Sequence, residues 1–82
     1  MAHLPPSSPE AERSVLGSML SSEAAFLEGI ETLTESDFYL MEHRKIFRAM
    51  LRLFEKKTNV DPVTLVDELE REGTLEQIGG RA

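Results

Sequence analysis

The residues that could do chemistry in this 82-residue chain are few and scattered. A metal site needs several histidine, cysteine or carboxylate ligands at a defined spacing, but the chain has two histidines, His3 and His43, and no cysteine. Covalent catalysis needs a serine or cysteine beside a base, and the serines fall mostly at predicted helix caps and turns. Gly79-Gly80 lacks the lysine and the preceding strand of a phosphate-binding loop. We therefore expect no enzymatic activity and assign no catalytic, cofactor-binding or metal-binding residue.

Several ionisable residues have a structural interpretation that competes with a functional one. The carboxylate pairs Asp67–Glu68 and Glu70–Glu72 are predicted on the outer, solvated side of a helix rather than as an acid–base couple. His43 lies beside an apolar helix face, where it either packs and hydrogen-bonds or has a functional role. Glu12 falls inside an apolar arc, and we predict it at the helix rim, where a carboxylate favours the positive end of the helix dipole.

The charges are unevenly distributed. The net charge of −6 argues against a nucleic-acid-binding protein, because affinity for DNA depends on neutralising phosphates. Residues 42–57 nevertheless carry six basic groups against two acidic ones, between two acidic segments. Five of these cations form a stripe on one side of a predicted helix: Arg44, Lys45, Arg48, Arg52 and Lys56. The stripe is either a solvated face that pairs with the acidic segments or a surface that docks an acidic partner or nucleic acid.

Helical periodicity and capping residues predict the elements that hold these groups. Residues 1–8 form an extended arm with two prolines, and residues 9–82 form a helical head domain. Ser7 is the expected N-cap of the first helix, with Glu10 completing a capping box. The fourth helix begins with Asp61 as its cap and Pro62 at its first position. The predicted helices cover residues 9–21, 23–33, 40–57 and 62–72, with a helical turn at 75–78.

The apolar residues predict how these helices pack. Phe38 and Tyr39, in the connector 34–39, are expected to fill the core. Gly17 and Gly29 lie inside helices, where glycine costs about 0.8–1 kcal/mol relative to alanine, so a close approach of two backbones is expected at each. No segment alternates with the period of a strand. The sequence therefore predicts an all-α fold, a compact orthogonal or bundle-like domain of four main helices plus short helical turns.

Composition also bears on the compartment. The absence of cysteine gives no disulfide framework. The apolar runs are much shorter than the ~20 residues of a membrane span, and no basic leader followed by an apolar stretch opens the chain. We expect a cytoplasmic protein with no membrane contact.

Four strings, in order, resemble the N-terminal domain of the DnaB-type bacterial replicative DNA helicases. Residues 5–17, PPSSPEAERSVLG, resemble the family's opening P-P-x-S-x-E-A-E-x-[AS]-V-L-G. Asp37-Phe38-Tyr39 with His43, Ile46 and Phe47 resembles its DFY…H…IF stretch. Residues 60–65 resemble VDLVTL, with Pro62 replacing an apolar residue, and residues 75–80 resemble LEEVGG. Together the strings cover nearly the whole chain.

The resemblance implies an all-helical head followed by a helical hairpin and a motor domain. In the family, hairpins pair the heads into dimers, and the dimers form a collar above the hexameric motor. The chain ends where the hairpin would begin, so we expect this fragment to be a monomer and to bind primase weakly or not at all. ATP and magnesium would belong to the motor. Glu12 matches a family position and would then be a polar anchor rather than a rim residue.

The resulting hypothesis is a non-catalytic collar domain of a bacterial replicative helicase. Its implied partners are the C-terminal domain of primase, other helicase subunits and a helicase loader, without DNA contact by this domain. Glu10, Arg44 and Arg48 are the predicted partner-binding residues. Two alternatives stay open: a small nucleic-acid-binding module that uses the basic stripe, and the helicase-binding domain of a primase, which has a similar helical shape.

Overall fold

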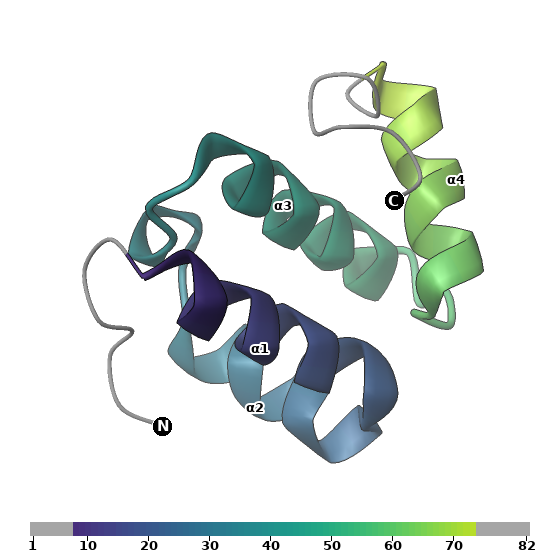
Figure 1. The fold of residues 1–82 in the computed structure, drawn as a ribbon. Coiled ribbons are helices and arrows are strands. Elements are labelled where there is room, and N and C mark those ends of the chain that lie inside the picture. The colour runs from purple at the N-terminus through teal and green to yellow at the C-terminus, as the bar shows by residue number, and fades with distance from the viewer. Residues whose placement is uncertain (1–7, 74–82) are drawn as a thin grey trace.

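The computed structural model describes residues 8–73. In this range the chain forms four α-helices and a short 3-10 helix, without a strand (Figure 1). The elements are α1 (Pro9–Ser21), α2 (Glu23–Thr32), η1 (Glu35–Asp37), α3 (Met41–Glu55) and α4 (Pro62–Glu72). The predicted all-α fold is confirmed, and each helix ends within two residues of its expected bounds. The predicted turn at 75–78 and most of the predicted arm lie outside the described residues.

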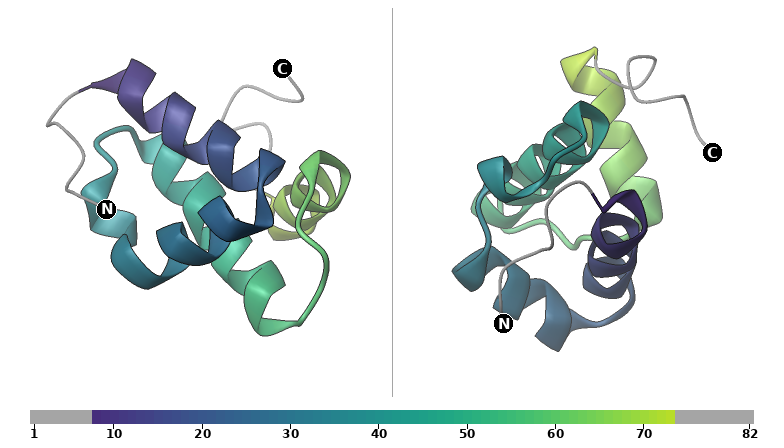
Figure 2. Two further views of the ribbon diagram at one scale, coloured as in Figure 1. Left: turned by 90° about the horizontal axis from the view of Figure 1, so that it is seen from below. Right: turned by 60° about the vertical axis from the view of Figure 1, so that its left-hand side comes forward.

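Helix α3 is the centre of the fold. Helices α1 and α2 form a helical hairpin joined by Ser22, which caps the end of α1 and the start of α2. Helix α3 packs against this hairpin, and α4 packs against the C-terminal part of α3 (Figures 1 and 2). No helix of the described range is long and apolar enough to cross a membrane.

Local capping explains where the helices begin. The cap of α1 is Ser8, not the expected Ser7: its hydroxyl accepts a hydrogen bond from the backbone N–H of Ala11, and Pro9 occupies the first helical position. Asp61 caps α4 as predicted. Its carboxylate accepts from the N–H of Thr64 at 2.9 Å, while the Thr64 hydroxyl accepts from the N–H of Asp61 at 3.0 Å. Local sequence is sufficient to start these two helices.

The core lies between α3 and the hairpin. Phe38 and Phe47 are fully buried, with ring centroids 5.1 Å apart, and Met50 is buried beside them on α3. The prediction for Phe38 is confirmed. The prediction for Tyr39 is wrong, because 61% of this residue is exposed. The backbone is extended at Phe38, so successive side chains point in opposite directions and only one of the two can enter the core.

The two helical glycines are not explained by contact between backbones. Gly17 is exposed, and a Cβ built there would meet nothing within 4 Å, so the expectation of close approach is wrong at this position. Gly29 is buried, and its Cβ would lie 2.7 Å from Sδ of Met19. The absence of a side chain at Gly29 therefore makes room for a methionine side chain rather than for a second backbone.

Helix α3 ends in a left-handed turn. Lys57 has φ 59°, the N–H of Lys57 bonds to the carbonyl of Phe54, and the N–H of Thr58 bonds to the carbonyl of Leu53. This is the hydrogen-bond pattern of a Schellman motif, in which glycine normally occupies the position of Lys57. The turn redirects the chain into residues 58–60, which lead to α4.

Candidate interaction surface and its supporting polar network

A carboxylate is buried at the junction of α1, η1 and α3. Glu12 of α1 has no exposed surface, so the prediction that it lies at the helix rim is wrong. Its oxygens accept hydrogen bonds from the backbone N–H groups of Tyr39 and Leu40, the latter at 3.4 Å. Leu40 is the N-cap residue of α3 and provides no side-chain cap. Glu12 therefore supplies, from another helix, an acceptor for the N–H of the N-cap residue, the group that the N3 side chain of a capping box normally binds.

His43 completes this buried group. Its Nδ1 lies 2.7 Å from Oε1 of Glu12, and the side chain is almost fully buried. Because an ionised carboxylate can only accept hydrogen bonds, Nδ1 must carry a hydrogen atom and donate the hydrogen bond. Of the two interpretations of His43, the structure supports packing and hydrogen bonding. The polar-anchor role that the family resemblance implied for Glu12 agrees with these contacts.

The surroundings of Glu12 favour its ionised form. Burial alone would raise the pKa of this carboxyl, because it disfavours charge. Hydrogen bonds from the N–H of Tyr39, from His43 and from the N–H of Leu40 outweigh that effect, and the pKa of Glu12 lies below its ordinary value. The start of α3 adds the positive end of a helix dipole. The group is thus a structural anion.

Most of the basic stripe on α3 is engaged within the domain. Arg48 forms a two-point ion pair with Glu35 of η1. Two further ion pairs join α3 to α4: Arg52 with Glu72 at 2.6 Å and Lys56 with Glu68 at 2.9 Å. Of the two interpretations of the stripe, these contacts support the one in which it pairs with the acidic segments.

Glu68 is the second buried carboxylate. Its side chain is 4% exposed, so the prediction that Asp67–Glu68 forms part of a solvated face is wrong for Glu68. Its partner Lys56 holds the pKa of Glu68 below its usual range against the opposing effect of burial. Asp67 does lie on the outer side, where it pairs with Arg71 one turn later at 3.0 Å. Two adjacent residues of α4 thus differ in environment: the carboxylate of Glu68 is buried and that of Asp67 is exposed.

The predicted partner-binding residues do not form one cluster. Glu10 is exposed at the start of α1. Arg44 and Arg48 both contact the connector before α3: Nε of Arg44 donates to the carbonyl of Phe38 at 2.6 Å, and Arg48 pairs with Glu35. The hydrogen bond from Arg48 lowers the pKa of Glu35. A direct test of these residues as partner contacts requires a partner, so this assignment stays a prediction.

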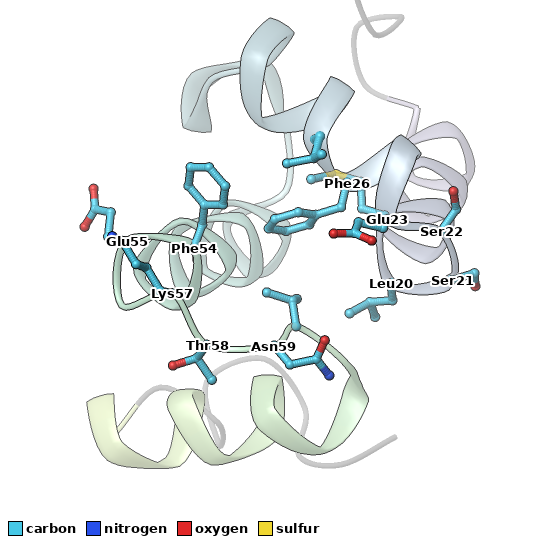
Figure 3. Close-up of a pocket in the computed structure, with 13 residues that line it drawn as sticks. Leu20, Ser21, Ser22, Glu23, Phe26, Phe54, Glu55, Lys57, Thr58 and Asn59 are labelled. Atoms are coloured by element: carbon cyan, nitrogen blue, oxygen red, sulfur yellow. The ribbon is translucent and has the colours of Figure 1, made fainter.

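Sequence reasoning missed an apolar groove of about 660 Å³. It lies between the α1–α2 turn, the end of α3 and residues 58–60 (Figure 3). Phe26 and Phe54 face each other there with ring centroids 5.9 Å apart, and Leu20 and Leu27 also line it. Phe54 was counted on the apolar side of its helix, and no sequence signal indicated that 43% of it would stay exposed.

These features define a small all-helical domain, built around a buried carboxylate–imidazole pair, with an apolar groove at its surface. Among residues 8–73, no three histidine, cysteine or acidic side chains gather where they could hold a metal ion. The chain belongs to the DnaB-like helicase N-terminal domain family, whose model matches residues 4–82. The family resemblance inferred from the four strings is therefore confirmed.

The relatives agree with this assignment. The chain is 46% identical over 76 residues to the replicative DNA helicase DnaB of Rhodothermus marinus and 46% identical over 77 residues to that of Geobacillus stearothermophilus. These alignments cover 93% and 94% of the chain but 8% and 17% of the two relatives, so the chain spans less than a fifth of their length.

A solved structure has the same fold. The N-terminal domain of DnaB helicase from Mycobacterium tuberculosis superposes with a TM-score of 0.87 at 41% identity, covering 95% of this chain and 54% of that one. By sequence and by fold, the chain therefore groups with the N-terminal domains of DnaB-type replicative helicases.

Proposed function

We propose that this chain is a non-catalytic collar domain that helps to organise the helicase ring and docks primase during DNA replication in the bacterial cytoplasm. The observation that carries the proposal is the family match over residues 4–82, together with a fold that agrees with a DnaB N-terminal domain over 95% of this chain. ATP hydrolysis with magnesium, and unwinding, belong in this proposal to the motor of the whole protein. A helicase loader is a further candidate partner.

The charge arrangement supports a domain that contacts proteins rather than DNA. Arg48, Arg52 and Lys56 pair with carboxylates of the same chain, and Arg44 donates to a backbone carbonyl. A DNA phosphate would have to displace these acceptors, in a chain that already carries a net charge of −6. The alternative of a nucleic-acid-binding module is therefore not favoured by any contact of the stripe.

The test compares the whole helicase with a form that lacks residues 1–82. Ring assembly is measured by native mass spectrometry, binding of the primase C-terminal domain by isothermal titration calorimetry, and ATP hydrolysis by phosphate release. We expect the deletion to weaken primase binding and to alter the distribution of oligomers, while ATP hydrolysis remains measurable. Unchanged primase affinity and unchanged ring assembly in the shortened protein would refute the proposal.

A second measurement addresses DNA. Fluorescence anisotropy of a labelled single-stranded oligonucleotide at low salt should show no binding by the 82-residue chain. Salt-dependent binding that is lost on replacing Arg44 and Arg48 with glutamate would instead establish the nucleic-acid-binding module.

A further inference from the structure

The apolar groove is separate from the buried polar network and from the basic stripe. Its walls are the first turns of α2 and the last turn of α3, and residues 58–60 close it on the third side (Figure 3). Its volume of about 660 Å³ is within the ~300–1,000 Å³ typical of binding clefts. The groove is therefore large enough to receive several side chains of a partner.

The groove leaves large apolar side chains in contact with water. Leu27 and Phe54 are each 43% exposed, from two different helices, although α3 buries Phe47 and Leu53 almost completely. Exposed apolar surface costs about 25 cal/mol per Å² relative to burial, and contiguous patches of it mark interaction sites on soluble domains. Covering these two side chains would provide the affinity for a partner.

Two carboxylates, Glu23 and Glu55, line the groove. Glu23, at the start of α2, points into the hollow towards Phe26 (Figure 3). The acidic residues of η1 and α4 that face α3 are paired with its cations. Glu55 and Lys57, of opposite charge, also line the groove. The two carboxylates and the one ammonium group of the lining together give the groove a net charge of −1.

We propose that this groove binds an amphipathic helix of a partner protein, with apolar side chains against Leu27 and Phe54 and a lysine or arginine beside Glu23. A helix suits the site because the described part of the chain offers no strand edge for an extended peptide to join. A partner of opposite charge suits the site because the chain itself carries a net charge of −6. This proposal for the groove does not depend on whether the chain docks primase.

The test uses two designed 18-residue helical peptides. Both carry leucines on one face at positions i, i+3, i+4 and i+7, and they differ in flanking residues, which are lysine in one and glutamate in the other. Binding to the 82-residue chain is followed by fluorescence anisotropy, and the site is mapped by amide chemical shifts in NMR spectra. We expect the lysine peptide to bind about tenfold more tightly at low salt, with shifts at Leu27, Thr58 and Asn59.

Matched substitutions separate the groove from the rest of the surface. Leu27→Ser should weaken binding of the lysine peptide about tenfold, whereas Val63→Ser, on α4 at 77% exposure and outside the groove, should not. Glu23→Lys should remove the preference for the lysine peptide. Glu31→Lys makes the same charge change on an exposed position of α2 outside the groove and should preserve the preference. Circular dichroism checks that each variant is folded.

Three outcomes would overturn the inference. If neither peptide binds, the groove is not a helix-binding site. Equal binding of the two peptides, or equal effects of Glu23→Lys and Glu31→Lys, removes the charge complementarity. Concentration-dependent dimerisation in sedimentation velocity, lost in Leu27→Ser, would make a second copy the occupant. None of these results bears on ring assembly by the whole helicase, so the proposed function is tested separately.

Discussion

The carboxylate of Glu12 lies 2.7 Å from Nδ1 of His43 and also accepts hydrogen bonds from the backbone at the start of α3. One side chain of the first helix therefore takes part in capping α3, because it accepts from the N–H of the N-cap residue Leu40. Because α3 is the helix against which the hairpin and α4 pack, this contact fixes the relative position of the hairpin and the rest of the domain.

Replacing Glu12 with glutamine should destabilise the domain by about 2 kcal/mol, because it removes a charged acceptor from a buried donor set. The free energy of unfolding is measured by urea denaturation followed by circular dichroism. Glu10→Gln is the matched control: Glu10 is exposed on the same turn of α1, and its substitution should change stability by less than about 0.5 kcal/mol. Equal effects of the two substitutions would contradict the capping role.

Acid should destabilise the domain through its paired carboxylates. The pKa values of Glu12, Glu35 and Glu68 are all lowered in the folded state. The folded chain then binds fewer protons than the unfolded chain in mild acid, so the free energy of unfolding falls as pH drops. The stabilisation is complete above the ordinary glutamate pKa of about 4.3 and is lost as pH falls through the lowered values.

Urea denaturation at several pH values checks this dependence. The Glu12→Gln variant should lose stability less steeply below about pH 4.3, because one of the responsible groups is missing. A wild-type stability that rises in acid, or a variant with the same steepness, would contradict the assignment.

The two anions of α4 should differ in their contribution to stability. Glu68→Gln removes the charge from an almost fully buried side chain whose partner, Lys56, is about half exposed, and we expect a loss of about 1 kcal/mol. Asp67→Asn removes an exposed pair with Arg71 on the same helix and should cost less than about 0.5 kcal/mol. Thermal denaturation of both variants at neutral pH distinguishes them. A larger loss in Asp67→Asn would be inconsistent with the packing of α4 on α3.

Substitution by alanine should affect the stability of the domain differently at the two helical glycines. Gly17→Ala adds a methyl group in open space and should stabilise the domain by about 0.8 kcal/mol through helix propensity. Gly29→Ala has the same propensity gain, but its Cβ would press on the side chain of Met19, so this variant should be less stable than Gly17→Ala by about 1 kcal/mol. Melting temperatures of the pair measure this difference, and equal temperatures would show that Met19 moves aside freely.

Features that depend on residues close together in the sequence were predicted correctly, and features that depend on packing between distant residues were not. The start of α4 was predicted correctly because Asp61, Pro62 and Thr64 form its cap within four residues. The fate of Tyr39 was not, because an exposed and a buried aromatic residue look alike in a short connector. The groove was not predicted either, because it depends on which part of α3 the hairpin and α4 leave uncovered.

The sequence by itself determined the helices, their limits and the family of the chain, since periodicity, caps and ordered strings are all local properties of the chain. The tertiary structure decided which carboxylates are buried: Glu12 was predicted at a helix rim and Glu68 on a solvated face, and their partners lie 31 residues later and 12 residues earlier. Burial of a charge depends on a counter-charge or donors that arrive from another helix, and no pattern within one helix records their position.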